Sequence, residues 1–205
     1  MVKNMVKIKL CGLSRKEDIE AANKLNPDFI GFVFYEKSSR NVTKEQAKLL
    51  KSLLNPEIKA VGVFVDEDIS FIKELISEGI IDIAQLHGSE DEEYIAVIKK
   101  QTKAPVIKAF KVREKEDVDL ANRSGADYVL LDSGMGTGKP FNWELLQGIK
   151  RDYFLAGGLD PENVRQALEV TGAFGVDVSS GIETDKKKDA AKMKRFVENV
   201  RGEIL

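Results

Sequence analysis

Short runs of hydrophobic and β-branched residues recur along the chain at roughly even intervals, and a polar turn follows each run. Behind most turns the apolar residues stand three or four positions apart, which is typical of a helix with one buried face. The runs themselves are typical of buried strands. They lie at 6–11, Asp28–Phe34, Ile58–Val65, Ile81–Leu86, Pro105–Phe110, Asp127–Asp132, Tyr153–Ala156 and Phe174–Ser179. The pattern therefore predicts eight units, each a strand followed by a helix.

Capping signals predict where several of these helices begin. A side-chain oxygen can accept a hydrogen bond from an unpaired backbone N–H, and a Glu or Gln three positions later can reciprocate. A proline at the first helical position costs nothing there, because that N–H has no helical partner. The predicted starts are three capping boxes, Ser14 with Glu17, Thr43 with Gln46 and Ser89 with Glu92, and an acidic cap, Asp160 before Pro161.

Alternation of strand and helix implies parallel strands with right-handed crossovers, which pack either as a doubly wound open sheet or as a closed barrel. Eight units favour the closed (β/α)8 TIM barrel, and a chain of 205 residues requires short loops in such a barrel. No linker rich in proline, glycine or serine divides the chain. We therefore predict an α/β protein with a single barrel domain over residues 1–205.

Composition narrows the classes of partner. Hydrophobic residues make up 42% and charged residues 32% of the chain, with a formal net charge of -2. Because there is no basic excess, we expect no nucleic-acid partner and no anionic membrane partner. No apolar run reaches the roughly 18 residues that span a bilayer, and the first ten residues lack the apolar core of a secretory signal. A cytoplasmic location is expected, and it suits a free thiol.

Cys11 is the only cysteine, and it ends the first predicted strand directly before Gly12. It has no partner for an intrachain disulfide, and with His87 as the only histidine a thiolate–imidazole zinc cluster is excluded. It is therefore either a buried small hydrophobe or a reactive thiol. Lys9 shares the strand face of Cys11, and a nearby ammonium would favour the thiolate.

In a β/α barrel the active site lies where the strands end, so residues at these positions are candidates for chemistry. Asp132 ends an apolar strand, where partial desolvation would raise its pKa and let it act as a general acid, although it could equally cap the next turn. His87 follows the fourth strand and is expected to line the pocket. Arg40 follows the second strand, either as a solvated side chain or as a bidentate clamp for a carboxylate.

Two glycine- and serine-containing segments follow the seventh and eighth strands, where many barrels bind a phosphate group. They are Gly157-Gly158 and the stretch Asp177-Val178-Ser179-Ser180-Gly181. Glycine allows the backbone to approach an anion closely, although either segment could be only a tight turn. Gly134 to Lys139 matches neither the phosphate loop of nucleotide-binding proteins nor the dinucleotide motif, and it is interpreted as a flap.

Taken together, these segments resemble the phosphoribosylanthranilate isomerase family of tryptophan biosynthesis. The resemblance runs in order from residue 6 to the final helix. It rests on the segments Lys9-Leu10-Cys11-Gly12-Leu13, Gly31-Phe32-Val33-Phe34, Ser38-Ser39-Arg40, Gln85-Leu86-His87-Gly88, Gly136-Thr137-Gly138-Lys139 with Trp143, Ala156-Gly157-Gly158-Leu159 and Asp177-Val178-Ser179-Ser180-Gly181-Ile182-Glu183.

The resemblance implies an Amadori rearrangement of N-(5-phosphoribosyl)anthranilate, the third step from chorismate, without cofactor or metal. It implies that Cys11 is the general base and Asp132 the general acid. By the same matching, Arg40 holds the anthranilate carboxylate, His87 lines the pocket, and the loops at Gly157-Gly158 and Ser179-Ser180-Gly181 hold the phosphate. Asp177 is expected as a further substrate-binding residue. The expected partner is this phosphosugar alone, bound by a monomer or a homodimer.

Two other functions stay open on the sequence alone. One is a barrel phosphosugar enzyme of another kind, such as a Schiff-base aldolase that uses Lys108. The other is a phosphosugar-binding module without catalytic activity, since the phosphate loops alone would serve binding.

Overall fold

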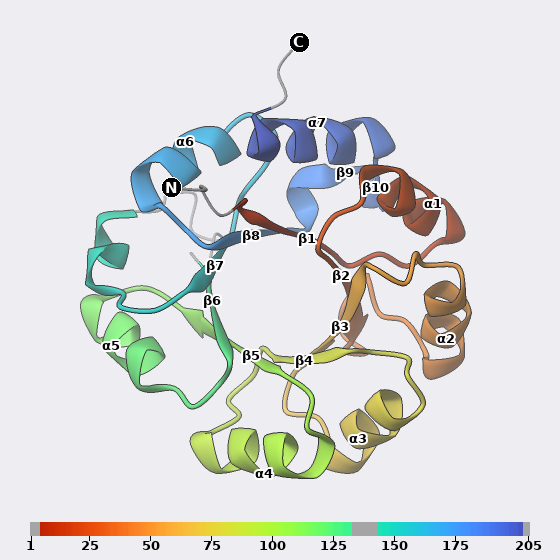
Figure 1. The fold of residues 1–205 in the computed structure, drawn as a ribbon, viewed down its shortest axis with the longest axis horizontal. Coiled ribbons are helices and arrows are strands. Elements are labelled where there is room, and N and C mark those ends of the chain that lie inside the picture. The colour runs from red at the N-terminus through yellow and green to blue at the C-terminus, as the bar shows by residue number, and fades with distance from the viewer. Residues whose placement is uncertain (1–4, 133–142, 203–205) are drawn as a thin grey trace.

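The computed structural model describes residues 5–132 and 143–202 as a closed barrel of parallel strands with helices packed around it (Figure 1). The strands lie side by side in chain order, and the last closes onto the first by pairing Lys9 with Asp177. The eight predicted strands are confirmed, and no boundary differs by more than two residues. Their bounds are β1 Lys7–Cys11, β2 Phe29–Phe34, β3 Lys59–Phe64, β4 Ile83–Leu86, β5 Val106–Lys111, β6 Tyr128–Asp132, β7 Tyr153–Ala156 and β8 Gly175–Val178.

The connections follow the predicted strand–helix alternation with two exceptions. After β6 the described residues form a 3-10 helix, η1, instead of the predicted α-helix, and after β8 a second 3-10 helix, η2, and a two-stranded hairpin precede the last helix. The bounds are α1 Lys16–Leu25, α2 Lys44–Ser52, α3 Ile69–Ser77, α4 Glu92–Thr102, α5 Lys115–Arg123, η1 Trp143–Gly148, α6 Val164–Thr171, η2 Ser180–Ile182, β9 Glu183–Thr184, β10 Lys187–Lys188 and α7 Ala190–Arg201.

The predicted cap of α2 is confirmed, whereas that of α1 is wrong by one residue. At α2 the Thr43 hydroxyl accepts from the Gln46 amide at 3.2 Å, and the Gln46 side chain accepts from the Thr43 amide at 2.9 Å. At α1 the Asp18 carboxylate accepts from the amides of Ser14 and Arg15, both at 3.0 Å, so that Arg15 is the cap. A buried carboxylate three residues inside the helix thus replaces the serine hydroxyl.

The predicted starts of α4 and α6 are also wrong in position. Asp91 caps α4 by accepting from the Tyr94 amide at 2.8 Å, while the Ser89 hydroxyl donates to the side chain of Asp66. Asp160 accepts from two amides of the turn that precedes α6, and the helix itself begins at Val164. In both places a carboxylate accepts from the free amides, but the helix begins later in the chain than predicted.

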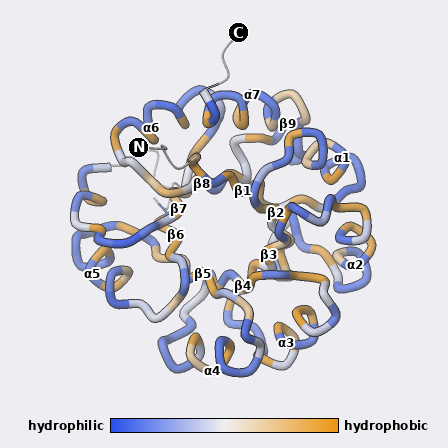
Figure 2. Tube along the Cα trace, viewed as in Figure 1, coloured by the Kyte–Doolittle hydropathy of each residue, from blue (hydrophilic) through white to orange (hydrophobic). Residues whose placement is uncertain are grey.

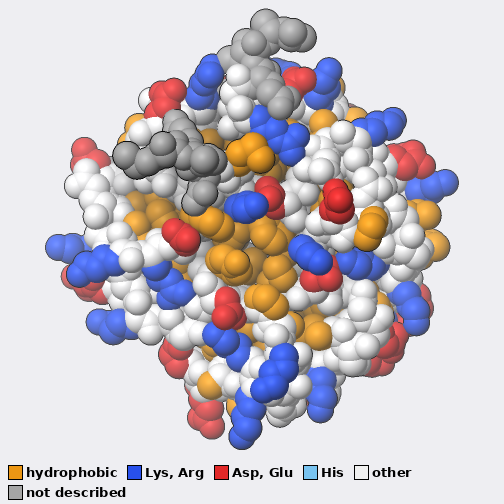
Figure 3. Space-filling view, viewed as in Figure 1, with side chains coloured by type: hydrophobic (Ala, Val, Ile, Leu, Met, Phe, Trp, Pro, Cys, Tyr) orange, Lys and Arg blue, Asp and Glu red, His pale blue; other side chains and the backbone are white. Residues whose placement is uncertain are grey.

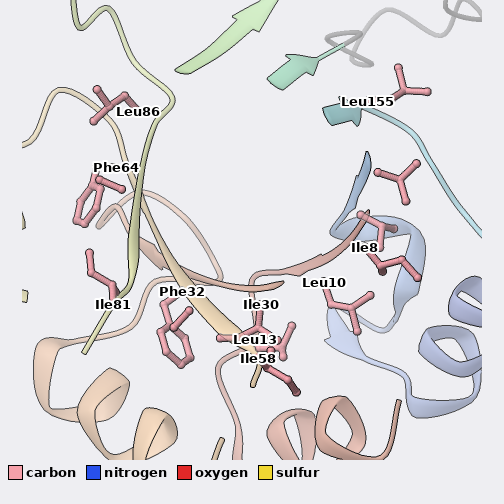
Figure 4. Close-up of a cluster of buried hydrophobic side chains, with 14 of the residues drawn as sticks. Ile8, Leu10, Leu13, Ile30, Phe32, Ile58, Phe64, Ile81, Leu86 and Leu155 are labelled. Carbon is pink, nitrogen blue, oxygen red and sulfur yellow. The ribbon is translucent and has the colours of Figure 1, made fainter. Parts of the chain in front are cut away.

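The hydrophobic core has two layers. The larger layer lies between the barrel and the helices and includes Ile8, Leu10, Ile30 and Phe32, all buried (Figure 4). Hydrophobic and hydrophilic positions alternate along the helices, as the colouring of Figure 2 shows, because each helix packs only one face on the strands. Among the described residues, no helix is long and apolar enough to cross a membrane.

The second layer fills the barrel interior and consists of side chains at alternate strand positions. Phe154, fully buried, makes edge contacts with Phe29, Tyr128 and Phe174 at centroid distances of 5.6, 5.9 and 5.7 Å. Hydrophobic side chains also gather at the centre of the face shown in Figure 3, within a surrounding of charged side chains. The aromatic packing closes the interior below the polar ends of the strands.

We expect Phe154→Ala to lower the free energy of unfolding by about 3–5 kcal/mol, because it removes the ring at the centre of this aromatic cluster. Urea denaturation measures the change. Leu120→Ala, at a side chain that is 51% exposed, is the control and should change it by less than about 1 kcal/mol. Equal effects of the two substitutions would contradict the role of the aromatic layer.

Candidate active site

A pocket of about 530 Å³ lies where the barrel strands end, within the range of small-molecule sites. The structure brings all but one of the sequence-predicted site residues to its wall. These are Cys11, Arg40, His87, Asp132, Gly157, Gly158, Asp177, Ser179 and Ser180. Gly181 instead lies behind the pocket, where a Cβ atom would be 1.9 Å from the Leu159 carbonyl oxygen. That position therefore admits no side chain.

Cys11 ends β1 with its thiol buried next to a charged pair. Lys9, two residues earlier on the same strand face, has no exposed surface and donates to the Asp177 carboxylate at 2.8 Å. Gly31 on β2 makes room for these groups, since a Cβ atom there would lie 2.7 Å from the sulfur and 3.2 Å from the Lys9 nitrogen. The thiol is therefore buried and at the same time part of the pocket wall.

Burial raises the pKa of the Cys11 thiol above its ordinary value, and the charge of Lys9 opposes but does not cancel this effect. Lys9 by itself lowers the pKa of the thiol, as expected, but the net pKa of Cys11 is still raised. Burial likewise disfavours the charge of Lys9, but the Asp177 carboxylate outweighs it, so the pKa of Lys9 is raised and its ammonium persists. In the free protein the resting form of this group is a neutral thiol beside a fixed cation.

His87 follows the fourth strand and lies between Gln85 of that strand and Asp132 at the end of the sixth. Its Nε2 lies 3.5 Å from Oδ2 of Asp132, and its Nδ1 lies 3.1 Å from the side-chain nitrogen of Gln85. If the Gln85 amide donates to Nδ1, the imidazole carries its proton on Nε2 and directs it at the carboxylate. In that tautomer the imidazole faces the Asp132 carboxylate with its N–H across 3.5 Å.

Arg40 is not a solvated side chain. It donates to both carboxylate oxygens of Glu183, from Nε at 2.6 Å and from Nη2 at 2.8 Å. Its aliphatic stem lies over Gly12, where a Cβ atom would be 2.6 Å from the Arg40 Cδ. One edge of the guanidinium is thus occupied. Among the described residues Nη1 has no hydrogen-bond partner, so it is available to a ligand in the pocket.

The two glycine and serine loops lie against each other, as the contact of Gly181 with Leu159 shows. Gly157 and Gly158 have φ values of +88° and +66°, a backbone form that residues with a Cβ atom rarely adopt. Ser179 is anchored by the ammonium of Lys188, which donates to its carbonyl at 2.9 Å and lies 3.2 Å from its hydroxyl. This is a concave, glycine-lined surface that suits an anion such as a phosphate group.

Lys108, the lysine of the Schiff-base alternative, does not line this pocket. Its side chain is almost wholly buried and donates to the Gly88 carbonyl and to the Glu90 carboxylate, both at 2.8 Å. Ile107 and Ala109, its neighbours on β5, face the barrel interior, so Lys108 faces the opposite side of the sheet. A Schiff base with a substrate in the pocket is therefore not supported.

Several residues of the site escaped sequence analysis. Gln85 and Lys111 line the pocket. Gln85 stands two residues before His87, and Lys111 stands two residues after Ala109, which faces the barrel interior. Strand alternation could have identified both. Glu183 and Lys188 are charged residues whose burial depends on distant partners, and no local signal distinguishes them.

A second cavity, of about 830 Å³, lies at the opposite end of the barrel, where the strands begin. Its charged residues include Asp28, Arg165 and Arg201. In β/α barrels this end is associated with stability, so it is not the candidate site. In the part of the chain that the structure describes, no cluster of three or more His, Cys, Asp or Glu side chains is placed to hold a metal ion.

The predicted flap, Gly134 to Lys139, lies outside the described residues. Its contribution to the site therefore remains a prediction.

Comparison with known proteins gives a consistent result over nearly the whole chain. The family model for N-(5'-phosphoribosyl)anthranilate (PRA) isomerase matches residues 8–199. The N-(5'-phosphoribosyl)anthranilate isomerase of Thermoanaerobacter sp. (strain X514) is 45% identical over 97% of this chain and 99% of its own length.

Solved structures agree with the sequence match. The phosphoribosyl anthranilate isomerase of Thermotoga maritima superposes with a TM-score of 0.87 at 37% identity, covering 97% of this chain and 100% of its own. Another structure of a phosphoribosyl anthranilate isomerase, in complex with reduced 1-(o-carboxyphenylamino)-1-deoxyribulose 5-phosphate, has a TM-score of 0.85 at 36% identity, with the same coverage. The chain belongs to the phosphoribosylanthranilate isomerase family.

Proposed function

We propose that this protein is a phosphoribosylanthranilate isomerase of tryptophan biosynthesis. It converts N-(5-phosphoribosyl)anthranilate into 1-(2-carboxyphenylamino)-1-deoxyribulose 5-phosphate. The observation that carries the proposal is the convergence of a strand-end thiol and a strand-end carboxylate on one pocket beside glycine-lined loops, in a member of this family. The reaction needs only proton transfers, so no cofactor is proposed.

Asp132 is the general acid of the proposed reaction. It donates a proton to the ring oxygen of the ribose, the bond between C1 and that oxygen breaks, and a Schiff base forms with the anthranilate nitrogen. Nε2 of His87 lies 3.5 Å from this carboxylate, on the same pocket wall. This step leaves a positive charge on the nitrogen next to C1.

Cys11 is the general base. Its thiolate removes the proton from C2, which the adjacent cationic nitrogen has made acidic, and the electron pair moves to give an enolamine. The enolamine then tautomerises to the ketone. Because the substrate supplies a cation at this stage, it opposes the burial that raises the pKa of Cys11 in the free protein.

The remaining pocket residues bind the two ends of the substrate. Nη1 of Arg40 binds the anthranilate carboxylate, and the loops at Gly157-Gly158 and Ser179-Ser180-Gly181 bind the phosphate. Asp177 acts through Lys9, to which it is bonded, and not by direct contact with the phosphate, because two anions would repel. A cytoplasmic location and the monomeric or homodimeric state remain part of the proposal.

The direct test generates phosphoribosylanthranilate in place and follows the loss of its fluorescence when the purified protein is added. Rapid loss that depends on protein concentration is expected. Without any loss at high protein concentration, the proposed activity would be wrong. Binding without turnover would instead identify a phosphosugar-binding module.

Removal of the proposed base or acid should abolish most of the turnover while substrate still binds. Cys11→Ala and Asp132→Asn are each expected to lower kcat by about 10²–10⁴-fold, the range for loss of general acid–base catalysis. Asp152→Asn, an exposed carboxylate before β7, is the matched control and should leave kcat unchanged. Near-normal turnover in either pocket variant would refute the assignment of that residue.

The pH dependence of kcat/KM should reveal the charged pair under Cys11. A thiolate base acts only when deprotonated, so kcat/KM is expected to rise with pH as Cys11 loses its proton. Lys9 lowers and Asp177 raises the pKa of Cys11. Lys9→Met should therefore move the rising limb to higher pH, and Asp177→Asn should move it to lower pH.

Opposite shifts of the two variants exclude a general loss of structure as the cause. Thermal unfolding of both variants provides the control for folding, because each substitution leaves a buried charge without its partner. Shifts in the same direction, or none, would show that this pair does not set the charge of the base.

A further inference from the structure

The hairpin of β9 and β10 follows the phosphate loop and carries two buried charged side chains. Glu183 and Lys188 face each other in its register, and the side chain of Glu183 is 8% exposed and that of Lys188 2%. The Lys188 ammonium lies 2.6 Å from the Glu183 carboxylate. Burial of such a pair is costly unless the remaining hydrogen-bonding capacity is also used.

Both members of this pair have further partners in the pocket wall. Glu183 accepts from Nε and Nη2 of Arg40, at 2.6 and 2.8 Å, while Lys188 bonds the carbonyl and hydroxyl of Ser179. Because these contacts hold Glu183 in its charged form, its pKa is lowered in spite of burial. A continuous chain of charge-assisted bonds thus runs from Arg40 through the hairpin to Ser179.

The hairpin itself is fixed to the helices on either side. Arg15 donates to the Lys188 carbonyl at 2.7 Å, next to α1, and Lys192 of α7 donates to the Glu183 carbonyl at 2.7 Å. The backbone is therefore held at both Glu183 and Lys188, the two residues that link Arg40 to Ser179. An arginine side chain has several rotatable bonds, and without such contacts it would lose much conformational entropy on binding a ligand.

The charges of this cluster also point to a ligand. Among the described residues, the two cations Arg40 and Lys188 form ion pairs only with the single carboxylate of Glu183. The free edge of the Arg40 guanidinium is where a further carboxylate would restore neutrality. A substrate with an anionic group at this end therefore fits better than a neutral one.

We propose that Glu183 and Lys188 are positioning residues that hold the carboxylate-binding Arg40 and the phosphate loop at Ser179 at a fixed separation. The pair thereby selects an aminosugar phosphate that carries a carboxylate on its amine substituent. This inference rests on the proposed function. It assigns to the hairpin the recognition of substrate length and of both anionic ends.

Two ligands separate the contributions of the two ends. One is reduced 1-(o-carboxyphenylamino)-1-deoxyribulose 5-phosphate, the ligand of the related structure, and the other is its phenylamino counterpart without the carboxyl group. Calorimetry gives the dissociation constant of each. The ratio of the two constants measures how much the carboxylate contributes to binding.

Glu183→Gln keeps the size of the side chain and removes its charge. We expect it to reduce the ratio about ten- to a hundredfold, because Arg40 is no longer held. The carboxyl-free ligand should be weakened much less, because Lys188 keeps its two bonds to Ser179. The KM for phosphoribosylanthranilate should rise by more than kcat falls. If Glu183→Gln does not fold, Glu183→Asp, which retracts the carboxylate, should give a smaller reduction of the same ratio.

Lys188→Met should weaken both ligands about equally, because it releases Ser179 in the phosphate loop. Lys187→Met, on the exposed side of the same hairpin, is the matched control and should change neither constant. Equal weakening of both ligands by Glu183→Gln, or no effect, would overturn the positioning role. Failure of the unsubstituted protein to bind either ligand or to turn over substrate would overturn the proposed function as well.

Discussion

The buried ion pair between Lys9 and Asp177 is the interaction on which the site depends most. It joins the first and last barrel strands at 2.8 Å between residues 168 positions apart, and Lys9 is wholly buried. Loss of either partner would strand a charge in the interior, which costs about 3–5 kcal/mol. Backbone pairing of β1 with β8 closes the barrel, and this side-chain contact across the same seam places a cation beneath Cys11. The seam that closes the barrel thus also carries the charges that act on the proposed base.

This arrangement accounts for the burial of the thiol that is proposed as the base. Burial keeps Cys11 neutral in the free protein, although Lys9 stabilises its thiolate. A neutral thiol is a poor nucleophile and resists oxidation, so the residue is protected until a ligand enters. The proposed substrate brings its own positive charge to the step in which the base acts. The protein then needs only to hold the thiol at C2, because substrate and Lys9 together favour its ionisation.

The sequence predicts the barrel because its strands are local patterns, and it predicts most of the pocket because strand ends converge in a closed barrel. Cys11, His87 and Asp132 all follow from this rule. The cap of α1 does not, because Arg15 is not a usual capping residue and the free amides there are satisfied by Asp18 from inside the helix. The partners of Arg40 escape sequence analysis for a different reason. Glu183 lies 143 positions away in a hairpin too short to give a strand pattern.

The residues that the sequence does not reveal have one property in common: their environment is created by tertiary contacts that no local sequence pattern encodes. Lys188 reads as one of several lysines in a polar stretch, yet its side chain is 2% exposed, whereas Lys187 beside it is exposed. Only the Glu183 carboxylate and the Ser179 carbonyl make that burial tolerable. A buried charged residue whose hydrogen bonds are all made has little freedom to move. In the proposed role, this rigidity keeps the carboxylate site at Arg40 and the phosphate site at Ser179 a constant distance apart. Polar residues added after the eighth strand can therefore refine recognition without disturbing the aromatic layer that stabilises the barrel.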